Sequence, residues 1–127
     1  MSKKILVVDN DPDLVDSVKT LLESKGYSVS GAYSGEEGIE KANSEKPDLI
    51  FLDVMMSTDS EGLDTAVKLR DSEATSDIPV IFLTGIRKPE FLTSSYRPGE
   101  DFPNVKATME KPVKPEEIFK KIEKAVK

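Results

Sequence analysis

The chain has 127 residues, and its 24 acidic and 18 basic residues give it a formal charge of −6. A chain of this length can bury a hydrophobic core without a disulfide or a structural metal, so we expect one domain over residues 1–127. Cysteine and histidine are both absent, which excludes thiolate chemistry, Cys/His zinc sites and Ser-His-Asp triads. The acidic balance provides no basic stripe for a nucleic-acid backbone, so we expect no direct nucleic-acid binding.

No segment of the sequence is apolar for long enough to cross a membrane. The longest apolar runs, such as 5–8 and 49–52, are far short of the ~20 residues that a membrane helix needs. The chain also does not open with a signal-peptide pattern. We therefore expect a cytoplasmic protein without membrane contact.

Short apolar runs alternate with segments of helical spacing along the chain, which predicts alternating strands and helices. Strands are expected at 5–8, 27–32, 49–52, 80–83 and 105–109. Most of these runs are apolar at every position, which is typical of strands covered on both faces. The pattern therefore predicts an α/β fold with a parallel sheet between two layers of helices.

The first helix is the best marked and is expected at about residues 12–25. Asp11 can cap its first turn, Pro12 fits the first helical position, and Gly26 can end it. Its apolar face is formed by Leu14, Val15, Val18, Leu21 and Leu22.

About five helices are expected in all. Ser34 and Glu37 form a capping box at the start of a second helix, which Lys46 and Pro47 end. Further helices are expected at 63–71 and from Pro115 onward, together with a short or irregular one within 86–104, where prolines interrupt the chain.

Polar residues follow four of the expected strands, where an open parallel sheet binds its ligands. They are Asp9, Asn10, Asp11, Asp53, Thr84 and Lys111. Carboxylates brought together in one cleft repel each other, a cost that a bound dication such as Mg²⁺ removes. A carboxylate beside a metal, a lysine and a hydroxyl is also suited to in-line phosphoryl transfer.

Four motifs in this order, ILVVDNDPD, DLIFLDVMM, VIFLTG and EKPVKPEEI, resemble those of response-regulator receiver domains of two-component signalling. The resemblance runs from about Lys3 to Val126. It implies Asp53 as phosphoacceptor, with Thr84 and Lys111 bonding the phosphoryl oxygens. It also implies a Mg²⁺ or Mn²⁺ site formed by Asp9, Asn10, Asp53 and the backbone carbonyl of Met55.

The same resemblance implies a flavodoxin-like fold with a doubly wound parallel sheet of strand order 2-1-3-4-5, flanked by about five helices. The implied function is a signalling switch rather than an enzyme. A histidine kinase or a histidine phosphotransfer protein would supply the phosphoryl group, and an unidentified downstream protein would bind the switched form. No output domain is expected within this chain, and the sequence leaves open whether it acts alone or within a longer regulator. It leaves a homodimer open as well.

Two of the positions that depart from the family pattern bear on the metal site and on its readout. Asn10 replaces an acid that normally binds the metal directly, so we expect weaker metal binding unless Asp11, Asp59 or Glu61 compensates. Thr108 stands three residues before Lys111, where the family often has an aromatic residue, and the usual aromatic readout of activation is therefore not expected.

Two other functions fit parts of the sequence. A degenerate receiver would dock a partner without phosphorylation, because Asn10 weakens its metal site. Alternatively, Asp-x-Asp after the first strand resembles haloacid-dehalogenase phosphohydrolases, in which Asp9 would be the nucleophile. The hydrolase leaves Asp53 without a role, and modification of Asp9 rather than Asp53 by acetyl phosphate would identify it.

Overall fold

The computed structural model describes residues 3–53, 61–84, 104–110 and 114–125. In chain order the elements are β1 (Lys4–Val8), α1 (Pro12–Glu23), β2 (Ser28–Ala32), α2 (Gly35–Glu45), β3 (Leu49–Asp53), α3 (Glu61–Asp71), β4 (Val80–Thr84), β5 (Val105–Glu110) and α5 (Pro115–Ala125). The stretch in which a fourth helix is expected, 86–104, lies outside the described residues except for its last one.

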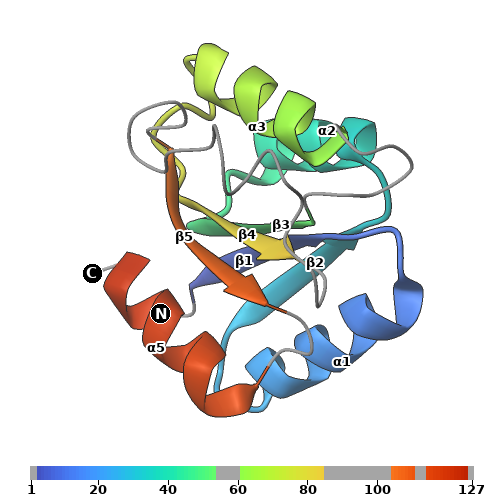
Figure 1. The fold of residues 1–127 in the computed structure, drawn as a ribbon, viewed down its shortest axis with the longest axis vertical. Helices are drawn as coiled ribbons and strands as arrows, with labels where there is room; N and C mark the ends of the chain where they lie inside the picture. Colours follow the sequence, from blue (N-terminus) through green and yellow to red (C-terminus); the bar gives the residue numbers. More distant parts are fainter. Residues whose placement is uncertain (1–2, 54–60, 85–103, 111–113, 126–127) are drawn as a thin grey trace.

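The five strands form one sheet of order β2-β1-β3-β4-β5, and every neighbouring pair is parallel. Both the parallel arrangement and the strand order are as expected. Figure 1 shows the strands fanned across the centre of the molecule, as is typical of a twisted sheet. Because all strands run the same way, their carboxyl ends meet at one edge of the sheet.

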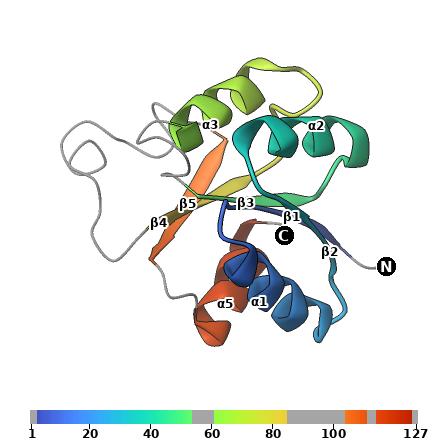
Figure 2. The same ribbon diagram turned by 90° about the vertical axis from the view of Figure 1, so that its right-hand side faces the viewer.

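Helices cover both faces of the sheet, with α1 and α5 on one side and α2 and α3 on the other (Figure 2). Successive residues of a strand point to opposite faces, and the buried residues accordingly divide into two clusters. The α1/α5 cluster includes Ile5, Val7, Leu49, Phe51, Ile81 and Leu83 from the strands. The α2/α3 cluster includes Leu6, Val8, Ile50, Leu52, Val80 and Phe82. This division explains why the strand sequences are apolar at every position.

Helix α1 begins as predicted, with Asp11 as its N-cap and Pro12 in its first turn. It ends at Glu23, two residues earlier than predicted, because the amides of Lys25 and Gly26 donate to Leu22 and Glu23 in a tighter turn. Gly26 has φ of 92°, a left-handed conformation that favours glycine.

Helix α2 begins with the predicted pair. The Ser34 hydroxyl accepts a hydrogen bond from the Glu37 amide at 3.1 Å, and the Glu37 carboxylate accepts from the backbone amide of Tyr33 at 2.9 Å. The helix ends at Glu45, and Lys46 is left-handed at φ of 51°. Among the described residues, no helix is both long enough and apolar enough to cross a membrane.

Candidate functional site

The candidate site lies at the carboxyl ends of β1 and β3, which are neighbours in the sheet. Val8 pairs in register with Leu52, so the next residues along the two strands, Asp9 and Asp53, occupy equivalent positions. The amide of Asp9 also donates to the carbonyl of Ala32 at 3.0 Å, which extends the alignment with β2 to Asp9. Adjacent strands lie about 4.8 Å apart, so the two acidic residues are close neighbours.

Both carboxylates are buried although they stand at the edge of the sheet. Asp9 is fully buried and Asp53 is 3% exposed. Asp53 continues the alternation of Leu49 and Phe51, which belong to the core on the α1/α5 side. Ionised carboxylates are costly to remove from water unless a cation or donor compensates. A pair of buried acids at strand ends therefore indicates a binding site.

Thr84 is the last residue of β4, the strand on the other side of β3. Its neighbour Leu83 pairs with Asp53 in register, and Thr84 itself pairs with Glu110 of β5. The backbone of Thr84 is therefore one step beyond the level of Asp53, at the same edge of the sheet. The structure thus brings the predicted positions 9, 53 and 84 to one place along three adjacent strands.

Two other predicted site residues, Met55 and Lys111, lie outside the described residues. Glu110, the residue before Lys111 in the sequence, pairs with Thr84 and lies at the same edge of the sheet. Thr108 pairs with Phe82 and is half-buried. A small side chain therefore lies where the sequence resemblance would lead one to expect an aromatic residue.

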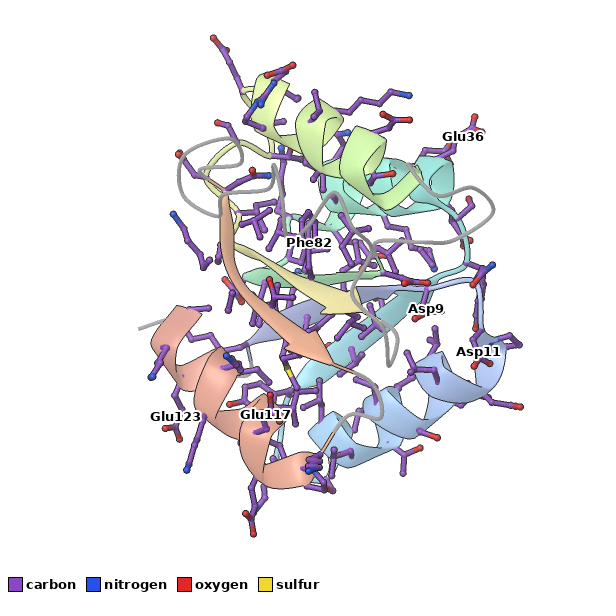
Figure 3. The ribbon with its side chains drawn as sticks, viewed as in Figure 1. Asp9, Asp11, Glu36, Phe82, Glu117 and Glu123 are labelled. Carbon is purple, nitrogen blue, oxygen red and sulfur yellow. The ribbon has the colours of Figure 1, made fainter. Side chains whose placement is uncertain are left out.

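Asn10 and Asp11 connect the end of β1 to α1, and Figure 3 shows Asp11 at the start of that helix. Asn10 is exposed. The side chain of Asp11 accepts a hydrogen bond from the amide of Asp13 at 3.0 Å, and its own amide donates to Asp9 Oδ1 at 2.9 Å. The capping role of Asp11 was predicted from the sequence, whereas its contact with Asp9 was not. An Asp-Pro pair directly after a strand could have signalled such a tight turn.

The donor chemistry of these residues fits a hard dication. Within the described ranges, no group of three or more acidic side chains is placed to hold a metal. Asp9 and Asp53 provide two buried carboxylates at neighbouring strand ends. Mg²⁺ is commonly bound by one or two carboxylates and retains several waters. Asn10 could add an amide oxygen, which carries no charge.

These features define a class: a doubly wound α/β domain with paired acids at the carboxyl ends of its central strands. The family model for the response regulator receiver domain matches residues 5–123. The chain therefore belongs to the response-regulator receiver family, whose members are signalling domains of two-component systems.

Relatives and solved structures agree with this assignment. The chain is 35% identical to the alkaline phosphatase synthesis transcriptional regulatory protein PhoP of Bacillus subtilis, covering 86% of this chain and 49% of PhoP. It is 32% identical to the regulatory protein VanR of Enterococcus faecium, and the alignment covers 86% of this chain and 51% of VanR. The chain thus spans about half the length of these curated relatives.

Among solved structures, a CheY-like receiver domain protein from Methanospirillum hungatei has a TM-score of 0.82 at 29% identity, covering 99% of this chain and 94% of that one. The chemotaxis protein CheY4 of Vibrio cholerae has a TM-score of 0.84 at 26% identity, and the alignment covers 98% of this chain and 99% of CheY4. Both alignments cover nearly the whole of each chain, which supports the flavodoxin-like fold predicted from the sequence.

Proposed function

We propose that the chain is a phosphoacceptor switch in which Asp53 receives a phosphoryl group. The observation that carries this proposal is the in-register pairing of β1 and β3, which brings buried Asp9 and Asp53 side by side at the carboxyl edge of the sheet. Family membership supports it, because receiver domains act in signalling.

In the proposed reaction, a carboxylate oxygen of Asp53 attacks the phosphorus of a phosphohistidine. The phosphorus–nitrogen bond breaks, and the imidazole leaves with the bonding electrons and takes up a proton. Asp9, Asn10, Asp53 and the carbonyl of Met55 would hold Mg²⁺ or Mn²⁺, which neutralises charge on the transferring oxygens when bound. Thr84 donates a hydrogen bond to one phosphoryl oxygen, and Lys111 pairs with another.

The partners follow from this chemistry. The donor is a histidine kinase or a histidine phosphotransfer protein in the cytoplasm, and the phosphorylated form changes its binding to a downstream protein. Residues 1–127 act as one receiver unit. The names of PhoP and VanR describe regulatory proteins, PhoP a transcriptional one. An output of this kind would require a partner or a further domain, because a chain with a net charge of −6 is poorly suited to bind DNA directly.

The test is incubation of the purified chain with acetyl phosphate and Mg²⁺, followed by mass spectrometry of the intact protein. We expect the addition of one phosphoryl group to the wild type. Chelation of the metal before the incubation should prevent this addition, and Asp53→Asn should not show it. Asp77→Asn is the matched control, because Asp77 is exposed and lies just before β4, at the opposite edge of the sheet. It should be phosphorylated like the wild type.

The two alternatives give different results. Borohydride reduction converts an aspartyl phosphate to homoserine, so peptide mapping identifies the modified residue. Conversion of Asp9 would support the phosphohydrolase and overturn the proposed role of Asp53. No phosphoryl addition to the wild type at saturating Mg²⁺ would support the degenerate receiver, which the replacement of an acid by Asn10 favours.

A further inference from the structure

We propose that Asp11 is a positioning residue of the phosphoacceptor site. While it caps α1 with its side chain, it holds the carboxylate of Asp9 with its own backbone amide. The inference rests on the proposed function, since it assigns Asp11 a role toward the cation that Asp9 and Asp53 would bind.

Asp11 is fixed by three hydrogen bonds. Its amide donates to Asp9 Oδ1 at 2.9 Å, its Oδ1 accepts from the Asp13 amide at 3.0 Å, and its carbonyl accepts from the Val15 amide at 3.1 Å. The bonds to the amides of Asp13 and Val15 belong to the start of α1. The bond from the Asp11 amide reaches Asp9, so the conformation at the start of the helix affects the position of the Asp9 carboxylate.

Pro12 reinforces this arrangement. Proline disfavours the helical conformation for the residue before it, and Asp11 is extended, with φ of −97° and ψ of 105°. Proline also has no amide hydrogen, so the cap must bind the amide of Asp13, as observed. The Asp-Pro pair therefore restricts Asp11 to a conformation compatible with both capping and its contact to Asp9.

The contact is significant because Asp9 is fully buried. A buried carboxylate depends on protein groups for the hydrogen bonds that water would otherwise supply. A backbone amide that donates to a carboxylate forms a charge-assisted bond, stronger than a neutral one. With Oδ1 held in this way, the rotation of the carboxylate is restricted, and its orientation toward a cation beside Asp53 is set before the cation arrives.

The carboxylate charge of Asp11 is not what this role requires. Its side chain is exposed and its Oδ1 is engaged by the Asp13 amide, so any side chain that caps α1 should serve. Asparagine and serine are good N-caps and alanine is a poor one. Asp11→Asn and Asp11→Ser should therefore keep the site intact, whereas Asp11→Ala should loosen it.

The first measurement is Mg²⁺ affinity by isothermal titration calorimetry on the full chain. Groups that orient a metal ligand typically contribute tenfold or more to metal affinity, so we expect Asp11→Ala to weaken binding about tenfold. Asp11→Asn and Asp11→Ser should stay within about twofold of the wild type, because both retain the cap. Equal weakening in Asp11→Asn and Asp11→Ala would overturn the proposal, since charge would then be responsible.

Ser34→Ala is the matched control. Ser34 caps α2, a helix of 11 residues against the 12 of α1, through a comparable bond to the Glu37 amide at 3.1 Å. Loss of this cap should lower the thermal midpoint about as much as Asp11→Ala but leave Mg²⁺ affinity unchanged. If Ser34→Ala weakened Mg²⁺ binding to the same degree, the effect would be general destabilisation and the proposal would fail.

A second measurement needs no metal. Hydrogen exchange followed by NMR should show the residue-11 amide protected in the wild type, in Asp11→Asn and in Asp11→Ser, and faster in Asp11→Ala. An unprotected residue-11 amide in the wild type would overturn the positioning role, even if Asp53 were phosphorylated. Conversely, a protected amide in a protein that accepts no phosphoryl group would refute the proposed function and leave the contact with Asp9 established.

Discussion

Gly38 of α2 lies directly against Val8 of β1: a Cβ atom added to Gly38 would be 2.8 Å from Val8 Cγ2 and 3.0 Å from Cγ1. Real Cβ contacts are essentially never shorter than 3.0 Å. The small residue therefore lets α2 approach the sheet beside β1, the strand that Asp9 follows. Val8 is itself buried in the α2/α3 cluster, so the contact joins the helix layer to the site edge.

Gly38→Ala should destabilise the fold although alanine favours a helix. Alanine gains about 1 kcal/mol over glycine in a helix, but overpacking a buried site costs about 1–3 kcal/mol, and the β-branched Val8 has little freedom to move away. The difference is a net loss of about 1 kcal/mol in the free energy of unfolding, measured by urea denaturation. Ser44→Ala, at an exposed position of α2, is the control and should be neutral or stabilising. An increase in stability for Gly38→Ala would contradict the close contact.

The strands and the sheet order were predictable because their signals are local or shared by the family. Runs apolar at every position marked β1, β3 and β4, and Asp11, Ser34 and Lys46 marked helix ends. The boundaries moved by one or two residues where turns intervene. For example, the amide of Tyr27 donates to the carbonyl of Leu22, which ties Tyr27 to the end of α1, and β2 begins one residue later at Ser28.

The site was predictable in its composition but only partly in its contacts. The acids at positions 9 and 53 follow from strand ends that meet at one edge. The bond between the Asp11 amide and Asp9 depends on the conformation of a two-residue turn, which periodicity does not encode. Contacts between distant segments, such as that of Asn104 Nδ2 with the Ala66 carbonyl at 3.3 Å, depend on tertiary packing and have no local signal.

Asn10→Asp should strengthen Mg²⁺ binding by restoring the acid that the family normally has at this position. Two unit charges 4 Å apart interact by about 1 kcal/mol in water and more near a protein surface. Because Asn10 is exposed, we expect a gain at the low end of that range, about fivefold in affinity by calorimetry. Asn43→Asp adds the same charge at an exposed position of α2 and should have little effect. Equal affinities for Asn10→Asp and wild type would show that the charge at this position is not limiting.

Thr75→Val should weaken the connection between α3 and β4. The buried Thr75 hydroxyl donates to the carbonyl of Leu69 at 2.7 Å, near the end of α3. Valine has nearly the same shape but no donor, so a buried carbonyl loses its partner at a cost of about 1–2 kcal/mol. Urea denaturation should show this loss, whereas Thr20→Val on the exposed face of α1 should be nearly neutral. Equal stability of Thr75→Val and wild type would mean that another donor replaces the hydroxyl.

The ion pair of Arg70 and Asp71 should shift the pKa of Asp71 but should have little effect on how the stability of the fold depends on pH. The hydrogen bond from Arg70 Nε to Asp71 Oδ1, at 2.9 Å, lowers the pKa of the Asp71 carboxyl, and the guanidinium charge adds to this effect. A carboxyl whose folded pKa is lowered contributes stability above its unfolded pKa and loses it as the pH falls through the folded value. Because the Asp71 side chain is 61% exposed, solvent screens the pair and the contribution at neutral pH should be slight. Arg70→Gln should therefore raise the pKa of Asp71 in an NMR titration without measurably changing unfolding at pH 7. High salt should narrow the pKa difference between the two proteins, and identical titrations at low salt would show that the pair does not persist in solution.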